Sequence, residues 1–312
     1  MSIVLNSRLV MDHLDKLESQ SIYILREAYH SFSNLCMPWS MGKDSNVLIW
    51  LSKKAFCGHI PYPLLHIDTT YEFPEMLEFR EWAVEKYKLD LIVKINEDAR
   101  AGTGSYTTSI GYETHDPVTV THELKTVALQ QIMAERKFDA LITGIRRDED
   151  PTRAKERYFS PRNAEFEWDY KDQPPEFWNQ FTTTLEPGEH IRVQPLLDWT
   201  EVDIWRYIAL ENIEVNPLYF SKVRPVVKRG KQLIMVDDER YQLNDGEEPE
   251  MKEVRFRTLG CYPLTAAVES TAANVAEVVE EVFQVKLSER ATRLIDGENE
   301  DSMEKKKREG YF

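Results

Sequence analysis

The stretch that decides the fold is 35–45, which reads Leu-Cys-Met-Pro-Trp-Ser-Met-Gly-Lys-Asp-Ser. Its first three residues are apolar, as in a short buried strand, and this pattern ends at Pro38. Apolar residues then recur with the spacing of one helical face, at Val47, Leu48, Leu51 and Ala55. Residues 40–45 are therefore predicted to form a loop that leaves a strand and opens a helix.

The composition of this loop suits the binding of a phosphate group. Gly42 lets the backbone come close to an anion, and the first N–H groups of the helix point towards it. Lys43 adds a positive charge, and Ser45 adds a hydroxyl donor. The pattern differs from a Walker A loop, because Asp44 stands where that motif has Ser or Thr. An ordinary helix N-terminus with a polar cap is the alternative interpretation.

Strand and helix patterns alternate over the first two-thirds of the chain. Further strand patterns lie at 64–67, 90–95 and 140–143, and 191–195 is expected to be the last central strand. Alternation of this kind predicts an α/β fold with an open, mostly parallel sheet and helices on both faces. Ligands of such sheets bind beyond the carboxyl ends of the strands.

Polar residues follow the strand patterns at three places that this topology brings to one edge. We expect this edge to bind a nucleotide. The residues expected to contact it are Ser40, Gly42, Lys43, Asp44, Ser45, Asp68, Thr69, Gly144 and Asp148. The segment 150–188 combines aromatic residues, prolines and charges without long apolar runs, and is predicted to be a long functional loop region.

Positive charge gathers in 146–162, although the chain as a whole is acidic. It has 39 Lys and Arg against 54 Asp and Glu, a formal net charge of −15, which disfavours general binding of nucleic acids or acidic membranes. Arginine forks suit phosphate or sulfate, so we expect Arg146 and Arg147, with Lys43, to be catalytic. A solvated loop with internal ion pairs is the alternative. The residues expected to hold the substrate anion are Arg153, Lys155, Arg157, Arg162 and Lys125.

The 312 residues predict one large domain with an extension: a nucleotide-binding domain at 1–215 and an irregular C-terminal extension at 216–312. In the extension, a strand is expected at 233–236 and a helix around 275–283.

No apolar run approaches the ~20 residues that span a bilayer, and the N-terminus lacks the order of a signal peptide. Three widely spaced cysteines do not indicate a zinc site or a disulfide framework. A soluble, cytoplasmic protein is expected.

Several motifs match one known family over nearly the whole chain. They lie at 39–45, 66–69, 144–149, 152–157, 199–205, 255–264, 267–270 and 302–312. With them the sequence resembles the small, ATP-binding subunit of bacterial sulfate adenylyltransferase, in the ATP pyrophosphatase superfamily that includes adenylyl-sulfate and phosphoadenylyl-sulfate reductases. The resemblance implies an adenine nucleotide α-hydrolase-like fold. It also implies a GTPase large subunit as the partner, with contact through 255–312.

The reaction implied by the resemblance is the conversion of ATP and sulfate to adenylyl sulfate and pyrophosphate, with Mg²⁺. Sulfate is already a dianion and needs no general base, so the task is to hold two anions and to stabilise the charge that develops. Either Asp44 or Asp68 is expected to orient the metal or the nucleotide.

Two departures from the family pattern leave another function open. Residues 100–121 are rich in Thr and Gly, and Glu72 stands where the family usually has a basic residue. They favour, as an alternative, a paralogue that adenylates another acceptor in nucleic-acid or metabolite thiolation. A reductase would need a redox cysteine, whereas Cys261 is expected to be a buried small residue. A non-catalytic subunit, either a nucleotide sensor or a scaffold, is a third alternative, against which the intact loop at 40–45 argues.

Overall fold

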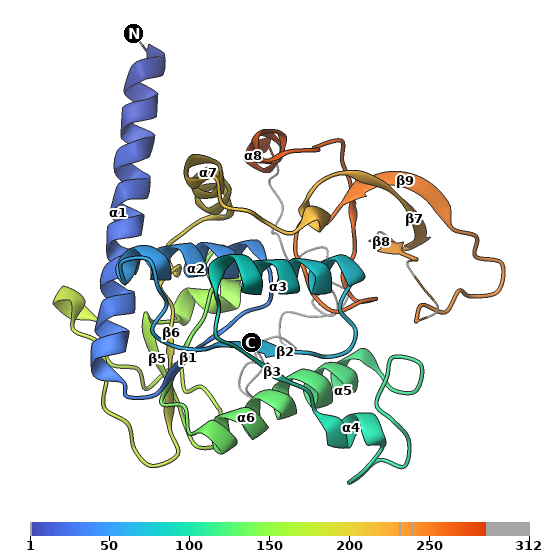
Figure 1. The fold of residues 1–312 in the computed structure, drawn as a ribbon, viewed down its shortest axis with the longest axis horizontal. Helices are drawn as coiled ribbons and strands as arrows, with labels where there is room; N and C mark the ends of the chain where they lie inside the picture. Colours follow the sequence, from blue (N-terminus) through green and yellow to red (C-terminus); the bar gives the residue numbers. More distant parts are fainter. Residues whose placement is uncertain (1, 231, 237, 239, 285–312) are drawn as a thin grey trace.

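A computed structural model describes residues 2–230, 232–236, 238 and 240–284. A six-stranded sheet of order β3-β2-β1-β4-β6-β5 forms its centre (Figure 1). The strands are β1 (Leu35–Pro38), β2 (Leu64–Ile67), β3 (Leu91–Lys94), β4 (Ala140–Ile142), β5 (Phe159–Arg162) and β6 (His190–Val193). All neighbours are parallel except β5, which is antiparallel to β6. The predicted open, mostly parallel α/β sheet is confirmed.

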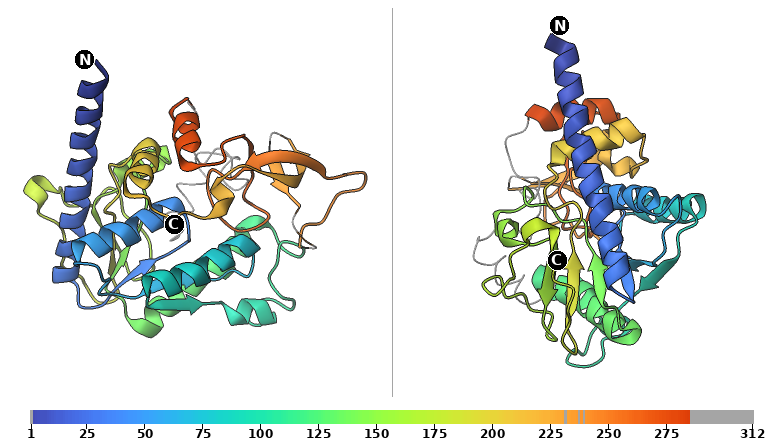
Figure 2. Two further views of the ribbon diagram at one scale, coloured as in Figure 1. Left: turned by 45° about the horizontal axis from the view of Figure 1, so that its top comes forward. Right: turned by 90° about the vertical axis from the view of Figure 1, so that its left-hand side faces the viewer.

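Helices cover both faces of this sheet, with α2 and α3 on one side and α6 on the other (Figure 1). The helices of this part are α1 (Ser2–Ser31), α2 (Lys43–Ala55), α3 (Pro74–Tyr87), α4 (Glu97–Ala101), α5 (Pro117–Thr121), the π-helix at His122–Val127, α6 (Ala128–Arg136) and α7 (Glu201–Glu211). The first helix, α1, extends beyond the body of the molecule at its N-terminal end (Figure 2). It precedes the first element that the sequence pattern predicted.

The alternation of side chains along the strands explains the two layers. Leu35 and Met37 of β1 belong to the core that includes α1, α2 and α3, whereas Cys36 between them packs with Leu129 and Ile132 of α6. Because the centre of the sheet is buried on both faces, β1 and β4 read as continuous apolar runs.

The segment 150–188 is more regular than the predicted loop region. It contains a 3₁₀ helix at Pro151–Lys155, the strand β5 and a 3₁₀ turn at Phe177–Asn179. Pro161 lies within β5 and breaks the apolar pattern of a strand, and β5 occupies the sheet edge, where proline is tolerated. Only its pairing with the distant strand β6 makes it a strand.

The C-terminal part forms a second, antiparallel sheet of order β10-β9-β7-β8. Its elements are β7 (Lys222–Arg229), β8 (Gln232–Met235), β9 (Glu250–Arg255), β10 (Val268–Glu269) and the following helix α8 (Val275–Gln284). The predicted strand at 233–236 and helix at 275–283 are confirmed, but the sheet was not predicted. Buried side chains of both parts share one core, as in the contact of Phe73 with Phe256, whose ring centroids lie 4.9 Å apart. The domain boundary at 215/216 stays a prediction.

Within the described part of the chain, no helix is both long enough and apolar enough to span a bilayer.

Candidate active site

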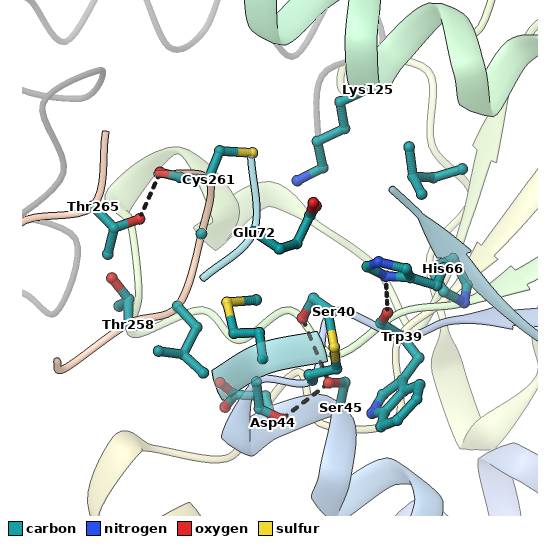
Figure 3. Close-up of a pocket in the computed structure, with 18 of the residues that line it drawn as sticks. Trp39, Ser40, Asp44, Ser45, His66, Glu72, Lys125, Thr258, Cys261 and Thr265 are labelled. Atoms are coloured by element: carbon teal, nitrogen blue, oxygen red, sulfur yellow. Dashed lines mark hydrogen bonds between the residues drawn. The ribbon is translucent and has the colours of Figure 1, made fainter. Parts of the chain in front are cut away.

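A cavity lies where the carboxyl ends of β1, β2 and β4 meet a segment of the C-terminal part (Figure 3). The loop 39–45, the π-helix and the segment 258–265 line it. Its volume is about 1460 Å³, counting the part that is open to solvent. The cavity lies at the carboxyl edge of the parallel strands, which is where open α/β sheets bind their ligands.

The loop that opens α2 has its unusual backbone at Met41. Met41 is fully buried with a φ of 59°, while Gly42 has a φ of −76°, which any residue adopts. A Cβ on Gly42 would lie 3.3 Å from Ser40 Oγ and 3.4 Å from the Tyr219 hydroxyl. A side chain at position 42 would press on both neighbours, so Gly42 leaves room for the close approach of Tyr219 to the loop.

Charged groups form a connected network beneath this loop. Lys43 Nζ is almost fully buried, 3.3 Å from Asp44 Oδ2 and 3.5 Å from the backbone oxygen of Arg257. The other oxygen of Asp44 accepts a hydrogen bond from Arg146, which is fully buried. Arg146 Nε also donates to Asp148 Oδ1 at 3.0 Å. Arg146 thus ties the loop after β1 to the segment after β4.

Many of the predicted site residues meet in the cavity. Those lining it are Ser40, Gly42, Lys43, Asp44, Ser45, Thr69, Lys125, Gly144 and Arg153. Lys125 extends from the π-helix into the cavity (Figure 3). Arg153 comes from the 3₁₀ helix after β4, where its guanidinium bonds Glu149. The cations Lys43, Lys125 and Arg153 therefore reach one space from three separate elements.

Other predicted residues lie outside the described lining, namely Asp68, Arg146, Arg147, Asp148, Lys155, Arg157 and Arg162. Arg147 forms an ion pair with Asp198, and Arg162 is buried with Nη2 3.0 Å from Glu156 Oε1. Lys155 Nζ lies 4.1 Å from the centroid of the Tyr170 ring. For Arg147 and Arg162 the alternative interpretation, internal ion pairs, describes the structure. The positive charge of 146–162 is thus spread over several contacts instead of one pocket.

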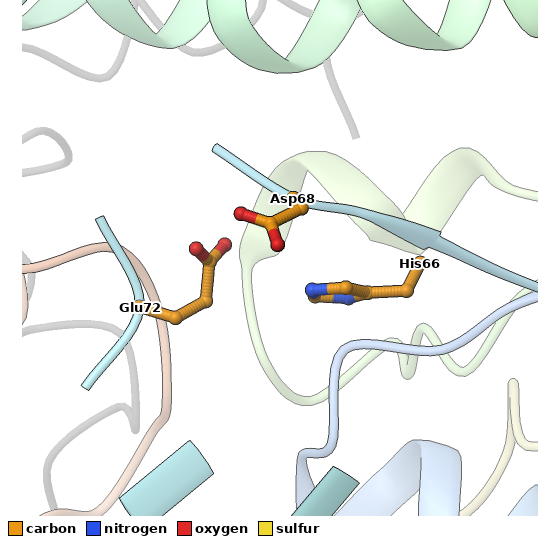
Figure 4. A group of neighbouring side chains, drawn as sticks. All are labelled: His66, Asp68 and Glu72. Carbon is orange, nitrogen blue, oxygen red and sulfur yellow. The ribbon is translucent and has the colours of Figure 1, made fainter. Parts of the chain in front are cut away.

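A histidine and two carboxylates cluster where β2 ends (Figure 4). One ligand atom from each of His66, Asp68 and Glu72 lies within 4.8 Å of the others. His66 is buried in the cavity wall, and its Nδ1 lies 3.3 Å from the backbone oxygen of Trp39. Burial lowers the pKa of His66 to about 4, so its imidazole is neutral at pH 7.

The two carboxyl groups of this cluster differ in pKa. Burial, with the neighbouring charge of Asp68, raises the pKa of Glu72 to about 7. Burial alone would raise the pKa of Asp68, but hydrogen bonds, His66 and the Arg80 guanidinium outweigh it and lower that pKa. Asp68 is therefore the carboxylate that carries the negative charge at neutral pH. Glu72 gains or loses its proton near neutral pH.

Part of the cavity lining was not predicted from the sequence. Residues 258–265 and Tyr219 reach the cavity from the C-terminal part, and His66 and Glu72 reach it from the β2 end. Cys261, expected to be buried, is partly exposed and lines the cavity, with Sγ 3.3 Å from Thr69 Oγ1. The motif at 255–264 was the available signal, but nothing in its spacing relates it to the β1 loop.

The fold and cavity define a nucleotide-binding α/β protein, and the model of the phosphoadenosine phosphosulfate reductase domain matches residues 34–267. The chain is 51% identical over 304 residues to sulfate adenylyltransferase subunit 2 of Hahella chejuensis, covering 97% of this chain and 98% of that protein. It is 49% identical over 310 residues to the same subunit of Akkermansia muciniphila, covering 99% and 100%.

Among solved structures, it is similar to the FMN adenylyltransferase of Candida glabrata in complex with ATP. The identity is 16%, the TM-score is 0.49, and the match covers 91% of this chain and 89% of that one. From the sequence relatives, the chain belongs to the sulfate adenylyltransferase subunit 2 family. The family resemblance stated from the sequence motifs is confirmed.

Proposed function

We propose that the adenylyl group of ATP is transferred to sulfate in this cavity, giving adenylyl sulfate and pyrophosphate. The predicted function and its enzyme class, a nucleotidyltransferase, are confirmed by the names of the relatives. The observation that carries the assignment to this cavity is the convergence of Lys43, Lys125 and Arg153 at the carboxyl edge of the sheet. There a ligand with several negative charges can be held.

The chemistry requires charge stabilisation more than proton transfer. A sulfate oxygen attacks the α-phosphorus of ATP, and the bond from that phosphorus to the oxygen bridging to the β-phosphate breaks. The electron pair leaves with pyrophosphate, so negative charge grows on the leaving group. Lys43, buried and held by Asp44, is a preorganised cation for that charge. Arg146 fixes Asp44 and is proposed as a positioning residue.

A magnesium ion fits the donor chemistry of this cavity. Mg²⁺ retains several waters and is bound through one or two carboxylates and the phosphates of the substrate. Of the two acids that the sequence left open, Asp44 lines the cavity and keeps 18% of its side chain exposed. Asp44 would hold the ion through the lone pairs that its contacts with Lys43 and Arg146 leave, and the ion would supply neutralisation of phosphate charge. Asp68 belongs to the His66 cluster instead.

A GTPase large subunit remains the proposed partner. The relatives are named as subunit 2 of an enzyme, which supports a heteromer. Within the proposed contact region 255–312, Arg255, Phe256 and Tyr262 are almost fully buried inside this chain. The proposed contact is therefore narrowed to 268–312, where Phe283 of α8 is 62% exposed.

The tail 302–312, which the sequence assigns to that contact, lies outside the described residues. Deleting it is expected to weaken co-purification with the GTPase subunit, and unchanged co-purification would contradict this role. The cytoplasmic location expected from the sequence stays a prediction.

The deciding experiment is isotope exchange between labelled pyrophosphate and ATP, with and without sulfate and the GTPase subunit. Exchange that depends on sulfate is the expected result. Exchange that ignores sulfate but responds to another acceptor would move the function to the paralogous reaction. Absence of any exchange with the partner and sulfate present would contradict catalysis in this cavity.

A further inference from the structure

The cluster at the end of β2 has a feature that its acidic residues alone would not give. Nε2 of His66 is buried and has no hydrogen-bond partner among the described residues. A buried polar atom without a partner costs about 1–3 kcal/mol, so such atoms usually meet a hydrogen-bonding group, an ordered water or a bound ion. Figure 4 shows the imidazole edge directed towards the carboxylates of Asp68 and Glu72.

The tautomer of His66 follows from its other nitrogen. Nδ1 lies 3.3 Å from the backbone oxygen of Trp39, which can only accept a hydrogen bond. Nδ1 therefore carries the proton, and Nε2 presents a lone pair. This is the arrangement of metal-ligating histidines, which donate the second ring N–H to a carbonyl or carboxylate.

The carboxylates are also held in place by neighbours. Glu72 Oε1 accepts from the backbone N–H of Thr69 at 3.1 Å and from its hydroxyl at 3.0 Å. Asp68 Oδ1 accepts from the backbone N–H of Thr70 at 2.8 Å. Each carboxylate oxygen has two lone pairs, so these bonds orient the groups and leave capacity for a cation.

We propose that His66, Asp68 and Glu72 bind one divalent transition-metal ion of the Zn²⁺ or Co²⁺ type. An imidazole nitrogen with two carboxylates suits such ions, whereas Mg²⁺ prefers oxygen ligands only. With three protein ligands, a fourth position remains for water or a ligand. His66 and Glu72 line the cavity, so that position is reached from the nucleotide side.

The surrounding charges limit this site without abolishing it. Arg80 Nη1 lies 3.2 Å from Asp68 Oδ2, and the positive charge of Lys125 also acts on His66. Arg80 thus compensates one of the two carboxylate charges. The remaining negative charge is the source of the repulsion between Asp68 and Glu72. A divalent cation between them would relieve that repulsion, which a monovalent contact does less well.

The test uses the full chain, stripped with a chelator and titrated with Co²⁺ and no nucleotide. One equivalent of Co²⁺ is expected to produce visible d–d absorption, and Zn²⁺ is expected to displace it. His66→Gln should abolish the band and lower Zn²⁺ affinity, measured against a chromophoric chelator, at least about tenfold. Because ATP is absent, the result is independent of adenylyl transfer.

Two further variants keep the test decisive. Glu72→Gln retains an acceptor for Thr69 and lies beyond the strand. It therefore reports on the site even if circular dichroism shows that His66→Gln is misfolded. His59→Gln changes an exposed histidine and should bind Co²⁺ as the unmodified chain does. Wild-type chain without a saturating band, or His66→Gln or Glu72→Gln chain that folds and keeps the band, would overturn the proposal.

Discussion

The backbone N–H of Lys43 donates a hydrogen bond to the hydroxyl of Tyr219 at 2.8 Å, although the two residues lie 176 positions apart. Tyr219 ends the 3₁₀ helix at Pro217–Tyr219, which leads into the C-terminal sheet. The bond occupies one of the N–H groups at the start of α2, because Lys43 is its first residue. The C-terminal part thus takes part in shaping the loop 39–45.

Tyr219→Phe is expected to destabilise the protein by about 1–3 kcal/mol, since it leaves a buried N–H without its partner. It should also raise the KM for ATP, because the loop loses one anchor. Urea unfolding and exchange kinetics measure the two effects. Tyr241→Phe is the matched control, because the buried Tyr241 hydroxyl has no partner in the described structure. Equal losses in both variants would contradict a specific role for the Tyr219 bond.

Lys43→Met is expected to reduce the rate of pyrophosphate–ATP exchange by about 10²–10³-fold, as removal of one preorganised charge-stabilising group does. Methionine replaces the stem of a side chain that is only 1% exposed, so folding should survive. The control is Lys53→Met, whose ammonium lies 4.7 Å from the centroid of the Tyr87 ring on the outside of α2. A scaffold without catalysis would show no difference between the two variants.

Arg146 and Arg147 are neighbours in sequence, but substitution should separate them. Arg146→Met removes a fully buried cation from Asp44, and the loss should lie near the lower end of the roughly 3–5 kcal/mol typical of buried pairs, because Asp44 keeps some exposure. Arg147→Met loses a partly exposed pair with Asp198 and should change stability by at most about 1 kcal/mol. Thermal and urea unfolding check the order. A larger loss of exchange activity in Arg147→Met than in Arg146→Met would support the catalytic role predicted for Arg147.

Glu72 should make stability depend on pH in a defined direction. Its pKa rises from 4.5 to about 7 on folding, so the folded chain binds more protons than the unfolded chain between these values. Glu72 therefore favours folding below about pH 4.5, and this contribution is lost as the pH rises through 7. His66, with its pKa lowered from 6.5 to about 4, has the opposite slope between those values.

The two slopes oppose each other, so a difference measurement is needed. With a chelator present, the unfolding free energy of Glu72→Gln minus that of the unmodified chain should increase from pH 4.5 to pH 7. Glu78→Gln, an exposed position on α3, is the matched control for removing a glutamate charge. A flat difference for Glu72→Gln would show that its carboxyl titrates normally.

The three cysteines should react with N-ethylmaleimide in three different ways. Cys57 is exposed and should react first, while Cys36 is fully buried, with a pKa raised well above its usual range, and should not react in the folded chain. In a Cys57→Ser background, ATP at ten times its Kd should slow the labelling of Cys261 about tenfold by occupancy. Mass spectrometry reads the label, and an ATP-independent rate would place Cys261 outside the nucleotide site.

The local patterns of the sequence were sufficient to predict most strands of the central sheet and the helices that follow them. The patterns of neighbouring residues predicted β1, β2, β3, β4 and β6, and the signal is continuous in β1 and β4, which are buried on both faces. Pro74 at the start of α3 and the Thr200–Asp203 capping box of α7 each act within one helical turn, so these features depend on adjacent residues alone. The chemistry of the Ser40–Ser45 loop and its family also followed from adjacent residues.

Long-range packing determined the rest. β5, which contains Pro161, became a strand only by pairing with β6, and the second sheet joins β7 to β9 across the chain. In sequence, Arg147 and Arg162 look like anion ligands. In the fold, Arg147 pairs with the distant Asp198 and Arg162 with the buried Glu156. The cavity wall at 258–265 and the orphaned nitrogen of His66 depend on the same three-dimensional neighbours. The residue types indicate which charges are present, but which charge faces the substrate depends on the partners that folding supplies.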